Sequence, residues 1–202
     1  PAAGPWGNPI RYGNRGAKGA FERAINTMRT YYLHIGQVNA SLPEPFRGTS
    51  WFGYGAPDTS YLTPLWPAMN ELPAHLGRGD RYGPFDRESG FWTNIYVQQM
   101  AELHYNEAIK HVRAAREPRL SMLYALTPRV LEAAAQMYAK DPKGAINLIT
   151  QYGCANAVAW QQDWLRLDDT LLGKYAMGMV DGHPTGYPQW WNEVIGYKPL
   201  VR

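Results

Sequence analysis

The stretch covering residues 25–55 constrains most strongly what this chain can fold into. Residues 28–39 are rich in Tyr, Leu, Ile, Val and Thr, with no proline and one glycine, and residues 49–54 form a short aromatic run. Both patterns predict strands, joined by the connection Leu42-Pro43-Glu44-Pro45. Two strands do not make a stable sheet, and the first has apolar side chains on both sides. We therefore expect a larger sheet that is covered on both faces of this strand.

The composition excludes several classes of protein. The chain has 202 residues with 45% hydrophobic and 18% charged residues, which is ordinary for one globular domain or part of one. The net charge is only +3, and the basic residues are scattered between acidic ones, so no nucleic-acid partner is expected. No apolar run is long enough to span a membrane, and the first residues do not form a signal peptide.

A single cysteine, Cys154, excludes an internal disulfide framework, a thiolate zinc cluster and a covalently attached haem, and we expect no cofactor. The chain has 8 Trp, 14 Tyr and 16 Pro residues. This content slightly favours a secreted or periplasmic location over a cytoplasmic one, but aromatic residues are more often simply large core side chains, so the compartment stays open.

The remainder of the first half is predicted to contain a third strand and a long loop. Residues 60–65 are the third strand, and residues 66–90 are interrupted repeatedly by Pro and Gly. Long ordered loops often carry function, so this loop is either part of a substrate cleft or a solvated loop with charged residues for solubility.

From Phe91 onward the periodicity becomes helical. Asp86 or Ser89 is expected to cap the longest helix, whose apolar stripe contains Trp92, Ile95, Tyr96, Met100, Leu103, Ala108, Ile109 and Val112.

Three further helices follow in the prediction. Thr127-Pro128 and Asp141-Pro142 each begin one, and Gly153 ends the second of these. The last spans residues 155–172, and its core stripe is Ala157, Trp160, Trp164, Leu167 and Leu171. A turn at residues 181–184 and a short tail helix with Trp190 and Trp191 complete the chain. Strands come before helices, which is typical of the α+β class.

Three groups of polar residues allow a functional or a structural interpretation. His104, Glu107 and His111 share one helix face and could bind a metal, but a polar helix face is the favoured interpretation. Cys154 is predicted at a helix start, where the dipole would lower its pKa; without a base nearby in sequence, a structural thiol is favoured. Asp163, Asp168 and Asp169 do not have the spacing of a glycosidase carboxylate pair.

Several motifs in order resemble one known family. They are AAGPWGNPIRY, MRTYYLHIGQVNASLPEPFRGTSWFGYG, FDRESGFWTNIYVQQMAELHY, LGKYAMGMVDG and GYPQWWNEVIGY. Together they resemble the carboxyl-terminal portion of a family C69 dipeptidase, an amino-terminal-nucleophile hydrolase. The resemblance implies that residues 1–202 are the carboxyl-terminal portion of a single hydrolase domain, with strands and long loops over residues 1–90 and mainly helices over residues 91–202. It also implies a four-layer αββα sandwich.

The resemblance further implies hydrolysis of dipeptides through a thioester. The nucleophile would be a cysteine at the mature amino terminus, with its own α-amino group as the base. Neither Pro1 nor Cys154 fits that role, so the nucleophile is expected on an amino-terminal segment of the same enzyme, and this chain alone is expected to be inactive. The alternative is a non-catalytic structural or assembly protein that keeps the fold. A homo-oligomer is left open.

The candidate site residues lie in the first predicted strand. Many relatives have a basic residue two positions after the glutamine, whereas this chain has Gln37-Val38-Asn39. Asn39 is the candidate oxyanion donor, because its side-chain NH2 can donate to a tetrahedral intermediate. Arg29 and Gln37 are candidate substrate-binding residues, and Arg29, which shares the parity of Asn39, also fits a structural ion pair. No metal site is assigned.

Overall fold

The computed structural model describes residues 25–27 and 30–186, and it combines small antiparallel sheets with three helices longer than three residues. The predicted segment at residues 1–18, Met28, Arg29 and the predicted tail helix lie outside the described residues. The strands are β1 (Tyr32–Val38), β2 (Gly48–Tyr54), β3 (Thr63–Leu65), β4 (Met179–Val180) and β5 (His183–Pro184). The helices are α1 (Gly90–Leu103), α2 (Tyr105–Tyr138) and α3 (Pro142–Tyr175), with short 3-10 helices η1 (Glu44–Phe46), η2 (Ala74–Leu76) and η3 (Ala176–Gly178).

The three strands of the main sheet follow one another in the order β1-β2-β3, and both pairings are antiparallel. The second predicted strand is confirmed almost to the residue, whereas the third is shorter than predicted. Residues 60–62 lie outside β3, although the backbone of Tyr61 comes close to β2. A Cβ atom on Gly53 would lie 2.0 Å from the Tyr61 carbonyl oxygen, so only glycine fits at this crossing.

Strand β1 is an edge strand, and the prediction that both of its faces are covered is wrong for the described residues. Six of its seven residues are exposed, and Val38 keeps 79% of its surface accessible. Tyr32 instead shares an open surface with an aromatic residue of β2, because it stacks on Phe52 with ring centroids 6.2 Å apart. The helical layer lies on the opposite face of the sheet.

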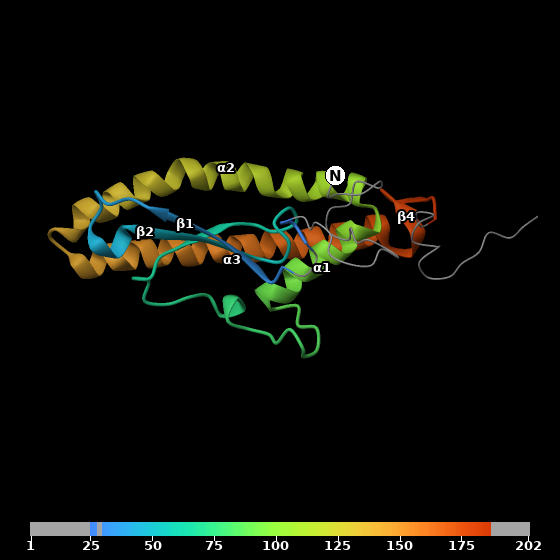
Figure 1. Ribbon diagram of the computed structural model, residues 1–202, viewed down its shortest axis with the longest axis horizontal. Coiled ribbons are helices and arrows are strands. Elements are labelled where there is room, and N and C mark those ends of the chain that lie inside the picture. The colour runs from blue at the N-terminus through green and yellow to red at the C-terminus, as the bar shows by residue number, and fades with distance from the viewer. Residues whose placement is uncertain (1–24, 28–29, 187–202) are drawn as a thin grey trace, which may run out of the picture.

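That helical layer is the antiparallel pair α2 and α3, which extends along the long axis of the molecule beside the sheet (Figure 1). The predicted core stripe of the last helix is confirmed, because all five of its residues are buried. Trp160 stacks on Tyr61 with ring centroids 5.3 Å apart, and its indole N–H donates to the Leu62 carbonyl at 3.1 Å. Trp164 donates to the Thr59 carbonyl at 3.2 Å. These two tryptophans hold α3 against the segment between β2 and β3 through ring stacking and hydrogen bonds.

Helix α1 begins as predicted, because the Ser89 hydroxyl accepts from the backbone N–H of Trp92. The predicted apolar stripe is wrong in this helix. The residues that face the interior are Gly90, Thr93, Asn94, Val97, Gln98, Ala101 and Glu102, whereas Trp92, Ile95, Tyr96, Met100 and Leu103 are only half-buried. Hydrogen bonds satisfy part of this polar interior face, as where Gln98 accepts from the Ala56 N–H at 3.1 Å. Tertiary partners therefore determine which side of α1 faces inward.

The predicted long helix is divided at His104, whose φ of −143° and ψ of 65° are not helical. The predicted helix start at Thr127-Pro128 is also wrong, because α2 continues through both Pro118 and Pro128. Both prolines lie on the exposed side, while Leu123, Thr127 and Leu131 pack inward. Packing of the buried face outweighs the backbone hydrogen bond that each proline removes.

Helix α3 begins at the predicted place, and the Asp141 carboxylate accepts from the Gly144 N–H at 2.9 Å. The predicted break at Gly153 is wrong, since the helix continues to Tyr175. Gly153 is there for close packing, because a Cβ atom would lie 2.7 Å from the Met69 methyl carbon.

The predicted turn is confirmed between β4 and β5, where Asp181 and Gly182 both have positive φ. The predicted loop at residues 66–90 is irregular apart from η2 and carries the ion pair Arg78–Asp86 at 2.6 Å. Over the described ranges, we find no helix whose length and apolar character would let it cross a membrane.

Candidate functional site

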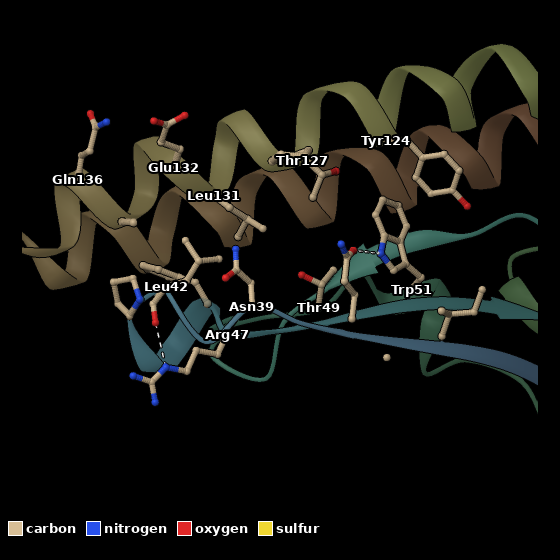
Figure 2. A pocket seen from close by; sticks show the side chains of 17 residues that line it. Asn39, Leu42, Arg47, Thr49, Trp51, Tyr124, Thr127, Leu131, Glu132 and Gln136 are labelled. Atoms are coloured by element: carbon tan, nitrogen blue, oxygen red, sulfur yellow. Dashed lines mark hydrogen bonds between the residues drawn. The ribbon is translucent and has the colours of Figure 1, made fainter.

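A cavity of about 960 Å³ lies between strands β1 and β2 and the second half of α2 (Figure 2). This volume falls at the upper end of the range for small-molecule sites. Both Gln37 and Asn39 line it. The strands contribute Ile35, Gly36, Gln37, Thr49 and Trp51, the β1–β2 connection contributes Asn39, Leu42, Pro43, Phe46 and Arg47, and α2 contributes Tyr124, Thr127, Pro128, Leu131, Glu132, Ala135 and Gln136.

Asn39 follows the last residue of β1, and its carboxamide is oriented by its own turn. Its Oδ1 accepts from the Ser41 backbone N–H at 3.1 Å and from the Ser41 hydroxyl at 2.7 Å. A backbone N–H can only donate, so the oxygen must face Ser41 and the NH2 group must face the other way. Figure 2 shows that nitrogen directed toward Leu131, across the cavity. Asn39 therefore presents a donor to the cavity.

Gln37 is oriented in the same manner by a different donor. Its Oε1 accepts from the Trp51 indole N–H at 3.0 Å, which leaves its NH2 group as the free end. Thr49 lies directly opposite Gln37 in the β1–β2 register. Its hydroxyl oxygen accepts from the Trp66 indole N–H at 2.9 Å, and its own proton stays available to donate.

The walls of the cavity are apolar, and its charged lining residues do not point into it. Arg47 donates from Nε to the Leu42 carbonyl at 2.9 Å, and Figure 2 shows its guanidinium directed away from α2. The same view shows Glu132 and Gln136 directed away from the strands. Among the described lining residues, the groups that face the cavity are thus apolar side chains and neutral polar groups, which include the NH2 groups of Gln37 and Asn39. Such a site suits a neutral acceptor oxygen attached to an apolar group.

The structure therefore brings together two of the three site residues that the sequence suggests. Their functional roles are untested and stay predictions. Arg29, the third, lies outside the described residues. Sequence reasoning missed Thr49, whose role depends on strand register, and the wall supplied by α2, which lies more than eighty residues further along the chain. Both depend on tertiary pairing that no local pattern reveals.

Two of the three residues of the potential metal site are engaged in ion pairs elsewhere. Glu107 pairs with Lys110 at 2.6 Å, and His111 lies 3.4 Å from Asp181. Burial lowers the pKa of His104. Within residues 25–27 and 30–186, no group of three or more His, Cys, Asp or Glu side chains is placed to hold a metal ion.

Cys154 lies within α3 and not at a helix start, so the expected dipole effect is wrong. Burial, together with the charge of Glu71, raises the pKa of the thiol, which disfavours the nucleophilic thiolate. Its sulfur lies 3.6 Å from the Glu71 carbonyl oxygen, and Cys154 is not among the residues that line the cavity.

The three aspartates of α3 are separate, as their spacing suggests. Asp163 pairs with Arg119 at 2.5 Å, and Asp169 pairs with Arg87 at 2.6 Å. Asp168 is fully buried, and neither of its oxygens has a hydrogen-bond partner among the described residues. Burial raises its pKa to about 8, with a further increase from Asp169 and an opposing effect of Arg87.

Comparison with known proteins identifies a family. The model of peptidase family C69 matches residues 7–118, which include β1, β2, β3 and α1. Among curated proteins, "Probable dipeptidase B" of Lactococcus lactis subsp. lactis (strain IL1403) is 26% identical over 84 residues. That match covers 42% of this chain and 17% of the relative, so the chain spans less than a fifth of the relative's length in the match.

Proposed function

This chain belongs to peptidase family C69, and on that premise we propose that it is part of a dipeptidase to which it contributes a wall of the substrate site. The observation that carries the proposal is the cavity itself. Its strand wall lies within the family match, and it presents the oriented NH2 groups of Gln37 and Asn39. The name of the Lactococcus relative supports a dipeptide as the substrate.

In the proposed reaction, Asn39 donates a hydrogen bond to the oxyanion that forms when the peptide carbonyl is attacked. A donor stabilises the transition state most when it is oriented before the reaction, because no reorganisation is then needed. The two hydrogen bonds from Ser41 supply that orientation. The attacking group is a cysteine outside these 202 residues, with its α-amino group as the base, and hydrolysis proceeds through a thioester.

The open face of the main sheet supports the second part of the proposal, that the sheet belongs to a four-layer αββα sandwich. Helices α2 and α3 cover one face, while Tyr32 and Val38 remain exposed on β1. A second sheet would bury these groups, which is worth roughly 25 cal/mol per Å² of apolar surface.

The test uses the protein expressed from its complete natural gene. We expect it to hydrolyse dipeptides, and alkylation of its nucleophilic cysteine to abolish activity even in a Cys154→Ala background. Asn39→Asp keeps the acceptor oxygen for Ser41 and replaces the NH2 donor. We expect it to lower kcat by about a hundredfold, about 3 kcal/mol, with little change in Tm.

Two outcomes would contradict the assignments. If Asn39→Asp leaves kcat unchanged while Asn39→Ala lowers Tm, then Asn39 only stabilises the turn. If the complete protein hydrolyses no dipeptide and contains no cysteine that reacts with the alkylating reagent, the non-catalytic alternative is supported and the dipeptidase proposal fails.

A further inference from the structure

Gln37 and Thr49 form a polar pair on adjacent strands, and Gln37 precedes Asn39 by two residues. The two members of the pair lie directly opposite one another in the antiparallel register, so their side chains share one face of the sheet about 5 Å apart. Both line the cavity. Thr49 is only 5% exposed, so its hydroxyl belongs to the floor of the cavity. The cavity therefore has a second polar position besides Asn39.

The pair offers both a donor and an acceptor to a ligand. The Trp51 indole N–H donates to Gln37 Oε1 at 3.0 Å, which leaves the Gln37 NH2 group to face the cavity. The Trp66 indole N–H donates to the Thr49 hydroxyl oxygen at 2.9 Å, and that oxygen keeps its own proton and a second lone pair. A primary carboxamide has an oxygen that accepts and an NH2 group that donates. The pair therefore complements a carboxamide, whose oxygen accepts from Gln37 and whose nitrogen donates to Thr49.

The spacing between this pair and Asn39 defines the length of a side chain that reaches both. The Asn39 N–H donates to the Arg47 carbonyl at 2.9 Å, so the pairing of β1 with β2 continues through Asn39. Gln37 and Asn39 are two residues apart in this extended segment, so they point to one face and are about 7 Å apart. An extended chain advances about 1.2 Å per bond, so about six bonds cover that distance. In a glutamine residue, six bonds separate the main-chain carbonyl oxygen from the side-chain carbonyl oxygen.

The walls around these polar positions suit an uncharged side chain. Leu131 lies across the cavity from the strands, and Trp51 meets Tyr124 edge to face with ring centroids 5.0 Å apart (Figure 2). The charged groups of Arg47 and Glu132 are directed away from the cavity in the same view. A carboxylate would lose its hydration here without gaining a cationic partner from the described lining, whereas a carboxamide would gain two hydrogen bonds.

We propose that the cavity selects dipeptides with glutamine as the first residue, whose side-chain carboxamide binds Gln37 and Thr49 while its main-chain carbonyl binds Asn39. The inference rests on the proposed dipeptidase function and adds the substrate class. The scissile carbonyl of a dipeptide belongs to its first residue, so a single substrate residue spans both positions. The second residue, with its carboxylate, stays outside the neutral cavity. Gln37 and Thr49 are then specificity-determining residues, whereas Asn39 acts on the oxyanion.

The test compares kcat/KM of the complete natural protein for dipeptides that differ only in the first side chain. We expect Gln-Ala to exceed Met-Ala about tenfold, because methionine has a similar length without the carboxamide. Asn-Ala should fall below Gln-Ala by a similar factor, because its carboxamide is one bond nearer the main chain. Glu-Ala should be poorer than Gln-Ala, because it carries a charge on nearly the same shape. Equal values for Gln-Ala and Met-Ala, or a preference for glutamine only as the second residue, would overturn the proposal.

Gln37→Met is the informative variant, since it removes the carboxamide and keeps the length of the side chain. We expect the ratio of kcat/KM for Gln-Ala to that for Met-Ala to fall to about one, mainly through a higher KM for Gln-Ala. Gln151→Met makes the same change at an exposed position of α3 outside the cavity and should leave the ratio unchanged. A Gln37→Met protein that keeps the full preference for Gln-Ala would overturn the assignment.

A binding measurement separates this inference from the proposed function. Calorimetric titration with glutaminamide and methioninamide presents the same side chains without a second residue, and we expect glutaminamide to bind more tightly. Dipeptide hydrolysis with no preference for glutamine would overturn the inference and leave the dipeptidase function standing. Tighter binding of glutaminamide that is lost in Gln37→Met, in a protein without dipeptidase activity, would support the site and refute the function. Equal binding of the two amides would overturn the inference.

Discussion

Replacing Trp160 by phenylalanine tests how the helical layer is held to the sheet. Trp160 is fully buried, stacks on Tyr61 and meets Trp164 edge to face at 5.3 Å. Phenylalanine retains an aromatic ring but loses the N–H that donates to the Leu62 carbonyl at 3.1 Å. The substitution therefore separates the hydrogen bond and ring size from the general need for an apolar side chain.

The expected loss of stability has two parts. A partly buried carbonyl left without its donor costs about 1–3 kcal/mol. The smaller ring leaves roughly 40 Å³ unfilled, which at about 24 cal/mol per Å³ adds about 1 kcal/mol. We therefore expect Trp160→Phe to lower the free energy of unfolding by about 2–4 kcal/mol.

The assay is guanidinium unfolding of the complete natural protein followed by circular dichroism, since a fluorescence signal would change with the tryptophan itself. Trp92→Phe is the matched control. Trp92 donates to the Asp80 carbonyl at 3.1 Å in an exposed hydrogen bond, so water can replace the lost donor and the cost should stay below about 1 kcal/mol. A Trp160→Phe protein as stable as the wild type, or equal losses in both variants, would refute this reasoning.

Three further predictions concern single positions. Gly53→Ala should lower the free energy of unfolding by several kcal/mol in denaturant unfolding, because the new Cβ would lie 2.0 Å from the Tyr61 carbonyl oxygen. Gly48→Ala is the control and should be nearly neutral, because nothing lies within 4 Å of its Cβ position. Equal losses in both variants would contradict the close approach of Tyr61 to Gly53. The pKa of Asp168 is raised from 3.8 to about 8 in the folded state, so between these two pH values the folded protein holds a proton that the unfolded protein has lost. The free energy of unfolding should therefore fall as pH rises from about 4 to about 8, and Asp168→Asn should remove that fall. An unchanged pH profile in Asp168→Asn would disprove this prediction. Cys154, whose pKa is raised by burial, should react with a thiol reagent far more slowly in the folded protein than after denaturation, and rapid reaction of the folded protein would show that it is accessible.

The helices show which signals the sequence carries reliably. The stripe from Ala157 to Leu171 was predictable because five apolar residues at helical spacing are expected to be buried in the core. The cap at Asp141 was predictable because side chain and backbone interact within four residues. Pro128 and Gly153 misled the prediction because both are local breakers whose cost is outweighed by packing between elements far apart in sequence.

Helix α1 is a case in which the helical periodicity is present in the sequence but predicts the wrong buried face. Its apolar residues suggest an inward stripe, yet the inward face carries Thr93, Gln98 and Glu102. Several polar groups of that face meet partners from other elements, as where Gln161 of α3 donates to Thr93 at 2.9 Å. Such partners cannot be read from the helix alone, so its orientation could not be predicted.

In the candidate site, one feature was predictable from the local sequence pattern and another depends on tertiary partners. Alternation along β1 places Gln37 and Asn39 on one face from sequence alone, and that placement was available before the structure. Which end of each carboxamide faces the cavity was not, because it depends on Trp51 for Gln37 and on Ser41 for Asn39. The tryptophans, which composition alone assigns to the core, also orient polar groups of the cavity. The Trp51 indole N–H donates to the Gln37 oxygen and the Trp66 indole N–H donates to the Thr49 hydroxyl, so the direction in which the Gln37 NH2 group points is determined by a residue of the neighbouring strand.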